Sequence, residues 1–526
     1  MVRYILATDR TLSSKYRNIP LGDFLGCIPS ERVPRFIFDF IAKVEPPLNT
    51  KGVARVAPYG LRKIEAALLE KGIPRKDIVV AHPSYLHNFI DNETKIVGIY
   101  TMDPLGFGPV SMMFCVGGKY TPYDALEFEA LLNRLNEIRQ SKGYKFKIVV
   151  GGPGAWQLSY KIERARELQI DHIVIGETEH IIDDIFEDIE NDDAPEIIHV
   201  RNYPKIDQIP EIVGASLQGL VEVMRGCGRG CDFCLPNLRA ARYMPLEKIT
   251  SEISTNVKFG ERGVWIHSED IFLYKLEDHK TFIPNRDAVL ELFNAIINVP
   301  GVHHAHPTHA SIAAIAADPE MIQKSSEILR ASPYNWIGIQ PGLETGSGDL
   351  LVKHMPNKIK PFSADEWSDV VIEATAILNQ NYWFPAYTII IGLPGETDDD
   401  ALATLELLER LETEVPQRVG PEKTHFIAAP LSFVPLAALK HKNMFNIEQE
   451  ITEARFQVIY KAWQIIVREA HKSLNSLVNQ PLPIKATINL IMRFGGHAIL
   501  RNIEKFGLRH GFTIPRKSRT LTIAAR

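Results

Sequence analysis

Three cysteines lie within one short run of this chain, Cys227-Gly-Arg-Gly-Cys231-Asp-Phe-Cys234. This CxxxCxxC spacing is the strongest constraint on the fold, because one loop must bring three thiolates to a single centre. An iron–sulfur cluster usually takes four cysteine ligands, so a cluster held here keeps one iron open to a chelating substrate. A zinc site or three buried core cysteines are the alternatives, since CxxC pairs also bind zinc. A structural zinc would need a fourth ligand, and no Cys or His follows Cys234 at knuckle spacing.

The composition limits the class of protein. A chain of 526 residues exceeds one ordinary core and predicts two or three domains. Its 45% hydrophobic and 23% charged residues are typical of a soluble globular protein, and the net charge of −5 gives no indication of a nucleic-acid partner. Five cysteines favour a reducing, cytoplasmic compartment, with Cys27 and Cys115 as small buried residues and one cluster in all. No apolar run reaches the roughly 18 residues that predict a membrane span.

Short apolar runs alternate with helical patterns in the N-terminal part. The pattern predicts helices at 60–71 and 125–140, and strands at 78–81, 95–101, 145–150 and 171–175. This alternation builds a doubly wound parallel sheet, whose ligands bind at the carboxyl ends of the strands. Those ends have Gly151, Gly152, Gly176 and Glu177, and glycine lets the backbone approach a ligand closely. Ordinary turns are the alternative explanation of these glycines.

A second run of strands and helices begins near residue 220 and leads into the cysteine loop. Active sites of parallel barrels lie at the carboxyl ends of the strands, so polar residues at such ends are candidates. Three predicted strands end in this way, at Glu269 and Asp270, at Glu344, and at Gly392 with Gly395. An acidic helix cap is the alternative for the first pair, and a Pro-Gly turn for the last.

The cysteine run, with its Gly and Arg filler, resembles the signature of the radical S-adenosylmethionine (SAM) superfamily. Gly342-Leu-Glu344-Thr-Gly-Ser and Ile391-Gly-Leu-Pro-Gly-Glu396-Thr resemble two further segments of that family. The resemblance implies a partial (β/α)6 barrel, with a 4Fe–4S cluster on Cys227, Cys231 and Cys234 and SAM on the open iron. It also implies SAM contacts by Glu269 and Asp270 (ammonium group), Glu344 (ribose or methionine part), Phe233 (adenine), and the Gly392 and Gly395 backbone (adenine).

Residues 54–200 resemble the cobalamin-binding domain that precedes many radical SAM cores, including archaeal ones. The resemblance rests on Tyr59-Gly60-Leu61, on Val149-Val-Gly-Gly-Pro-Gly-Ala155 and on Ile175-Gly-Glu-Thr-Glu179. It implies that Gly151, Gly152, Gly176 and Glu177 contact cobalamin. The chain lacks the Asp-x-His-x-x-Gly loop of one branch, so we expect no histidine on the lower face of the cobalt.

Several further residues have more than one interpretation. His303, His304, His306 and His309 crowd one predicted strand, and we expect His306 and His309 to contact substrate or transfer protons, with ordinary polar lining or a metal cluster as alternatives. Arg225 and Arg229 would offset the charge of the cluster or face solvent. By resemblance, Lys358 is a further candidate beside the segment of Glu344.

The C-terminal part is predicted to be helical, and its end is basic. From Arg493 to Arg526 there are eight Lys or Arg residues and one acid, Glu504. Such a helix either lies on an anionic membrane or caps the barrel with its apolar face. We therefore expect a cytoplasmic protein with possible contact to the inner membrane face. The expected domains are 1–205, 206–435 and 436–526, with Pro204 and Pro210 in the linker.

The resemblance implies an enzyme that cleaves SAM to methionine and a 5′-deoxyadenosyl radical acting on an unactivated carbon, with cobalamin then donating a methyl group. Radical carbon–carbon bond or ring formation on a lipid-like substrate is one alternative. A non-catalytic cobalamin or SAM sensor is another. A third is a tRNA or protein methylthiolating enzyme, a class that normally has three more cysteines. Expected partners are a small-molecule or lipid substrate and an electron donor such as ferredoxin or flavodoxin.

Overall fold

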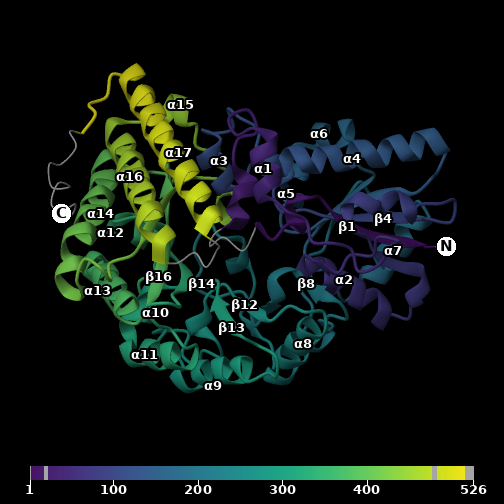
Figure 1. Cartoon of the computed structure of the whole chain (residues 1–526), viewed down its shortest axis with the longest axis horizontal. Coiled ribbons are helices and arrows are strands. Elements are labelled where there is room, and N and C mark those ends of the chain that lie inside the picture. Colours follow the sequence, from purple (N-terminus) through teal and green to yellow (C-terminus); the bar gives the residue numbers. More distant parts are fainter. Residues whose placement is uncertain (1, 17–21, 477–481, 516–526) are drawn as a thin grey trace.

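The computed structural model describes residues 2–16, 22–476 and 482–515, without the side chains of 23, 237, 238 and 473–494. Figure 1 shows a sheet of N-terminal strands at the right and an open barrel, in teal and green, below and to the left. The helices α16 (Glu453–Ser476) and α17 (Leu482–Arg509) lie together at the upper left of the view. This α/β arrangement with a helical C-terminal region is the predicted fold class.

The N-terminal sheet has six parallel strands in the order β3-β1-β4-β5-β6-β7. Numbered along the chain, this is the doubly wound order 2-1-3-4-5-6, whose switch point lies between β1 and β4. The strands are β1 (Tyr4–Thr8), β3 (Ile78–Val80), β4 (Ile96–Tyr100), β5 (Lys147–Gly151), β6 (His172–Ile175) and β7 (Ile197–His199).

The strand β1 lies inside this sheet, although the pattern predicted no element there. All five of its residues are buried. Ile5 and Ala7 join the apolar cluster on one face of the sheet, while Tyr4 and Leu6 join the cluster on the other. A strand covered on both faces is apolar without alternation, which leaves it no signature beyond a short apolar run.

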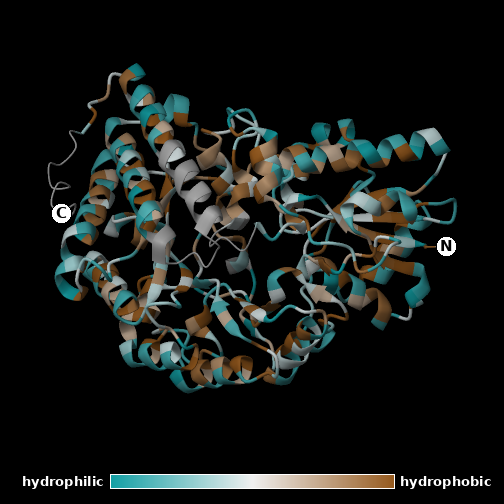
Figure 2. Cartoon of the chain, in the orientation of Figure 1, coloured by the Kyte–Doolittle hydropathy of each residue, from teal (hydrophilic) through white to brown (hydrophobic). Residues whose placement is uncertain are grey.

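Helices cover both faces of the sheet. One face has α2 (Tyr59–Glu70) and α7 (Ile182–Glu190), and the other has α4 (Tyr123–Lys142), α5 (Ala155–Tyr160) and α6 (Ile162–Glu167). In Figure 2 the strands are mostly brown, whereas the outer faces of the peripheral helices are largely teal. The apolar stripe of each helix therefore packs on the sheet.

The barrel is an open array of parallel strands. Its strands are β9 (Leu220–Glu222), β12 (Gly263–His267), β13 (His304–Pro307), β14 (His309–Ala310), β15 (Ile337–Glu344), β16 (Trp383–Ile391) and β17 (Ile427–Ser432). They form two sheets, β13-β12-β9 and β14-β15-β16-β17. Thr308 joins the two sheets, because its N–H donates to Ile266 and its carbonyl accepts from Gln340. The array is therefore one curved surface with open edges at β9 and β17.

Helices surround the barrel, and their bounds are α8 (Leu246–Lys258), α9 (Arg286–Ile297), α10 (Ile312–Ala317), α11 (Pro319–Ile328), α12 (Gly348–His354), α13 (Trp367–Gln380) and α14 (Asp398–Val419). Strand residues alternate between the helices and the barrel interior. Val264 and Ile266 are fully buried in the apolar core. Trp265 pairs with His306, so these two side chains share the opposite face, which is the barrel interior.

The segment between the N-terminal sheet and the barrel is held to the N-terminal part by a short strand pair. It includes β8 (Ala215–Ser216), which pairs in parallel with β2 (Val56–Ala57). The boundaries at 205/206 and 435/436 remain proposals.

The C-terminal helices pack on the barrel. α16 lies against α14 and β17, and α15 (Ile447–Glu450) precedes it. Arg455 of α16 donates to the carboxylate of Glu396 at 2.8 Å. Five of the eight basic residues between Arg493 and Arg526 have side chains outside the described part, so the membrane contact of this segment stays a prediction. Among the described residues, no helix is long and apolar enough to cross a membrane.

Candidate active site at the carboxyl ends of the barrel strands

The cysteine loop runs from β10 (Met224–Arg225) to a short 3-10 helix that starts at Leu235. Gly226, Gly228 and Gly230 alternate with Cys227 and Arg229, and the φ angles of the three glycines are 76°, 75° and 74°. Residues other than glycine rarely adopt this left-handed backbone conformation, so these three glycines allow the tight turns of the loop. Cys227 and Cys231 are buried, and Cys234 is half-buried.

The loop fits an iron–sulfur cluster chemically. Burial raises the pKa of the Cys227 thiol to about 12, so a bare thiolate is disfavoured there at neutral pH. Metal binding deprotonates cysteine, and the positive metal would balance the negative charge of the buried thiolates. The three cysteines come from one loop, as the spacing predicts.

Arg229 holds the loop against the barrel. Its guanidinium donates to the carbonyl of Asn357 at 2.7 Å and to the Ser311 hydroxyl at 2.8 Å, and it lies 3.4 Å from the Asp270 carboxylate. The same group stacks 4.7 Å from the centre of the Phe282 ring. Arg229 is 3% exposed, so the alternative that it faces solvent is wrong.

Arg225 ties the cysteine loop to the N-terminal sheet. It is buried and pairs with Glu177 at 2.6 Å, Glu179 at 2.6 Å and Glu222 at 2.9 Å. Its charge is thus balanced by three carboxylates, two of which follow β6 of the other domain. Arg225 therefore does not face solvent either. Because it stands two residues before Cys227, its ion pairs couple the sheet edge to the start of the cysteine loop.

Glu177 is the centre of this contact. Besides Arg225, it accepts from Arg239 at 2.9 Å and from Arg242 at 2.7 Å. Burial raises the pKa of Glu177, but the three arginines outweigh that effect and lower it to about 2. The structure places this predicted cobalamin residue in an ion-pair network between the two domains.

The glycines of the sheet edge lie against the backbone of the protein. A Cβ on Gly152 would come within 2.6 Å of the Thr101 carbonyl oxygen, and one on Gly176 would overlap the carbonyl of Val200. Both have positive φ angles, of 104° and 122°. Gly151, by contrast, has room for a Cβ. Close packing between loops therefore accounts for Gly152 and Gly176 without a ligand.

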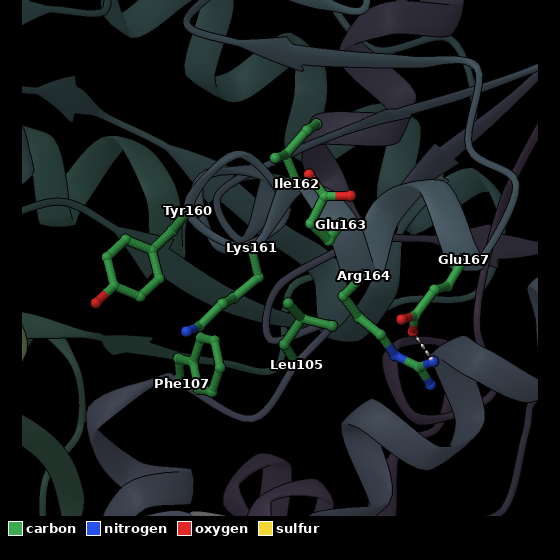
Figure 3. Close-up of a pocket in the computed structure, with 8 residues that line it drawn as sticks. All are labelled: Leu105, Phe107, Tyr160, Lys161, Ile162, Glu163, Arg164 and Glu167. Atoms are coloured by element: carbon green, nitrogen blue, oxygen red, sulfur yellow. Dashed lines mark hydrogen bonds and ion pairs between the residues drawn. The ribbon is translucent and has the colours of Figure 1, made fainter.

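A pocket of about 550 Å³ opens on the same domain (Figure 3). It lies between the loop after β4 and the α5–α6 junction, where the Phe107 and Tyr160 rings meet edge to face. Its size suits a small ligand. None of the predicted cofactor residues lines it; the lining residues are Leu105, Phe107, Tyr160, Lys161, Ile162, Glu163, Arg164 and Glu167.

Glu269 and Asp270 follow β12 but differ in their surroundings. Both oxygens of Asp270 have protein partners, the Ser311 N–H at 3.0 Å and Arg229. Glu269 is buried enough to raise its pKa, and one of its oxygens, Oε2, is without a hydrogen-bond partner among the described residues. Its other oxygen pairs with Arg239 at 3.5 Å, so Oε2 is the atom left to accept a hydrogen bond.

Glu344 and Lys358 form a buried ion pair at 3.1 Å. Glu344 has a φ of 64°, and the register of β15 with β16 shifts between Gly342 and Glu344. A non-glycine residue held in this strained conformation is typical of a functional site. Burial lowers the pKa of Lys358, but the Glu344 carboxylate and the nearby Cys231 thiol outweigh this and raise it. Arg229 of the cysteine loop donates to the Lys358 carbonyl at 3.3 Å, so the pair lies beside that loop.

The segment of Gly392 and Gly395 lies under neighbouring side chains. Both glycines have positive φ, of 83° and 88°. Their Cβ positions would overlap Phe445 and the Lys353 amine, respectively. Phe233 is half-buried against the barrel core.

His354 is a positioning residue that no motif in the sequence marks. Its Nε2 lies 2.9 Å from the Pro394 carbonyl, and its Nδ1 lies 3.3 Å from the Asp232 carboxylate. Asp232 also donates its N–H to the His354 carbonyl. His354 thus links the cysteine loop to the predicted adenine segment.

The histidines are distributed along the barrel strands. His306 is on β13, and His309 is on β14, where its Nδ1 lies 2.9 Å from the Thr308 hydroxyl. Burial lowers the pKa of both His306 and His309 to about 4, so both are neutral at pH 7. Within the described residues, the four predicted histidines do not converge as a metal site.

The barrel and its cysteine loop match a known superfamily. Residues 221–408 match the radical SAM superfamily and form a domain of that superfamily. A tRNA-2-methylthio-N(6)-dimethylallyladenosine synthase of Verminephrobacter eiseniae is 24% identical over 326 residues, which cover 59% of this chain and 65% of that protein. A threonylcarbamoyladenosine tRNA methylthiotransferase, MtaB of Thermotoga maritima, is 26% identical over 291 residues, which cover 54% and 61%. The chain therefore spans less than two thirds of these two relatives.

A solved structure shares the fold over most of the chain. It is the radical SAM methyltransferase TsrM of Kitasatospora setae with cobalamin and a 4Fe–4S cluster bound. The TM-score is 0.51 at 13% identity, covering 84% of this chain and 77% of TsrM. The relatives named here are bacterial, so they give no support to the archaeal resemblance.

Proposed function

We propose that this chain is a radical SAM enzyme that uses cobalamin to transfer a methyl group to an unactivated carbon. The observation that carries the proposal is the set of groups around the cysteine loop: the unpartnered oxygen of Glu269 and the strained Glu344–Lys358 pair, both at carboxyl ends of barrel strands. When bound, the reduced cluster would supply the electron that cleaves SAM to methionine and a 5′-deoxyadenosyl radical.

The residues of the chain bind and orient SAM. Glu269 would accept a hydrogen bond from its ammonium group. Glu344, fixed by Lys358, would contact the ribose or methionine part. His354 would hold the Gly392–Gly395 segment, whose backbone would contact adenine, at a fixed distance from the cysteine loop. His306 and His309 would contact the substrate as neutral imidazoles.

Two observations support cobalamin as the methyl carrier. The fold resembles TsrM, whose structure contains cobalamin. The Arg225–Glu177 contact also brings the carboxyl edge of the N-terminal sheet next to the cysteine loop. Gly152, Gly176 and Glu177 have protein partners, however, so we derive no step through cobalamin.

Radical carbon–carbon bond or ring formation on a lipid-like substrate needs the same SAM site, and a sensor would bind the cofactors without turnover.

Methylthiolation is the second candidate, favoured by the names of the sequence relatives. It transfers sulfur as well as a methyl group, and the class normally supplies three more cysteines. Outside the CxxxCxxC run this sequence has only Cys27 and Cys115. Two thiols cannot provide that second set, so we rank this reaction below methyl transfer.

The test is anaerobic reconstitution with iron and sulfide, followed by SAM and a strong reductant or a ferredoxin or flavodoxin system. We expect 5′-deoxyadenosine from the wild type and from Cys115→Ala, a buried cysteine outside the loop, but none from Cys231→Ala. Bound cobalamin and a product heavier by one methyl group would support methyl transfer, whereas a methylthio product on tRNA would support the second candidate. An intact cluster that never cleaves SAM would favour the hypothesis of a non-catalytic sensor.

A further inference from the structure

A second cluster of metal-ligating side chains lies in the N-terminal domain, at the switch point between β1 and β4. Asp103 follows β4, Asp124 lies in the first turn of α4, and Cys27 ends the 3-10 helix Gly22–Cys27. Three distant segments thus meet at the sheet edge where doubly wound folds bind ligands. None of these residues belongs to the SAM site.

The geometry of the three groups matches a small cation. One ligand atom from each of Cys27, Asp103 and Asp124 lies within 4.8 Å of the others. The Cys27 sulfur is 3.5 Å from Oδ2 of Asp124. A tetrahedral zinc with bonds of about 2.3 Å to sulfur and about 2.0 Å to oxygen places two such ligands about 3.5 Å apart. The pair therefore has the required separation already.

The cluster is buried, and its carboxylates have no cation partner among the described residues. Cys27 and Asp103 are 9% and 6% exposed. Among the described residues, no Lys, Arg or His forms an ion pair with Asp103 or Asp124. Asp9, at the end of β1, adds a further buried carboxylate to the same edge. Buried carboxylates without a cation partner are costly, and a divalent ion removes that cost.

Two buried polar atoms at the cluster have no hydrogen-bond partner among the described residues. They are Oδ2 of Asp103 and the hydroxyl oxygen of Ser111. Ser111 is completely buried, and its hydroxyl lies beside Cys27 and Asp103 outside regular hydrogen-bond geometry. A buried hydroxyl and a buried carboxylate oxygen that make no regular hydrogen bond indicate that a ligand belongs between them.

We propose that Cys27, Asp103 and Asp124 bind a zinc ion, with the Ser111 hydroxyl or a water at the fourth position. Mixed sulfur and oxygen ligation at tetrahedral spacing suits zinc better than calcium or magnesium, which prefer oxygen alone. The ion would fasten the N-terminal segment and α4 to the loop after β4. This site is structural, and it stands independently of the proposed function.

The test measures zinc in the full chain with its cysteine loop loaded with the iron–sulfur cluster. The protein is exposed to buffered Zn²⁺, dialysed against metal-free buffer, and analysed for zinc and iron by mass spectrometry. We expect about one zinc per chain in the wild type, with a zinc-edge X-ray absorption spectrum of one sulfur and otherwise oxygen ligands. Cys27→Ser and Asp124→Asn should lose the zinc and keep the iron.

Cys115→Ser is the matched control, because Cys115 is also fully buried and its thiol lies 3.5 Å from the Cys27 carbonyl. It should retain zinc at the wild-type level. No retained zinc in the wild type, or zinc with several sulfur ligands, would overturn the proposal, since the latter places the ion on the CxxxCxxC loop. If Cys27→Ser fails to fold, Asp103→Asn and the wild-type spectrum decide the question.

Discussion

Glu177→Gln should weaken the contact between the N-terminal sheet and the barrel. The Glu177 side chain is 11% exposed and is shared by Arg225, Arg239 and Arg242. Glutamine has nearly the same shape and can accept a hydrogen bond, but it removes the negative charge. The substitution therefore isolates the electrostatic part of the contact.

The magnitude follows from the pKa of Glu177. The three arginines outweigh burial and lower this pKa from 4.5 to about 2. At about 1.4 kcal/mol per pKa unit, this corresponds to about 3 kcal/mol, and solvent screening at the rim reduces it to about 2 kcal/mol. Because the folded pKa is the lower one, this stabilisation is complete above pH 4.5. It is lost as the pH falls from 4.5 towards 2.

The assay is urea unfolding of wild type and Glu177→Gln at pH 7 and near pH 3. The variant should unfold at lower urea at pH 7, and the gap should narrow at the lower pH. Glu196→Gln is the control, because Glu196 also pairs with an arginine, Arg166, but on the surface of the same domain. Equal midpoints for wild type and Glu177→Gln at pH 7, or a gap that does not depend on pH, would refute the reasoning.

Three further results are expected. Glu269→Gln should weaken SAM binding roughly tenfold with little change in stability, whereas Asp270→Asn should lower the unfolding midpoint because it breaks a buried ion pair; equal SAM dissociation constants for wild type and Glu269→Gln would contradict this. Gly342→Ala should slow SAM cleavage, because its Cβ would push the Glu344 carboxylate and the Lys358 amine out of their ion pair, while Gly338→Ala, on the same face of β15, has open space and should keep the wild-type rate. Cleavage rates should show no titration of His309 between pH 6 and 8, since burial lowers its pKa to about 4; a step near pH 6.5 that His309→Gln removes would show otherwise.

The sequence located the parts of the SAM site because each has a local signature. The cysteine spacing, the glycines that permit left-handed turns, and the apolar runs that end in Glu269, Glu344 or Gly392 are all readable within a few residues. The doubly wound sheet and the barrel follow from the same local periodicities. Strand β1 was missed because a short, doubly buried strand has no alternation.

What only the tertiary structure decided is which side chains meet. Glu177 looked like a ligand contact in sequence, and its position opposite Arg225 makes it an ion-pair partner across the domain boundary. Cys27, Asp103 and Asp124 have no motif spacing, yet they converge at one sheet edge. Such contacts depend on how separate elements pack, and periodicity along the chain contains no information about partners far apart in it.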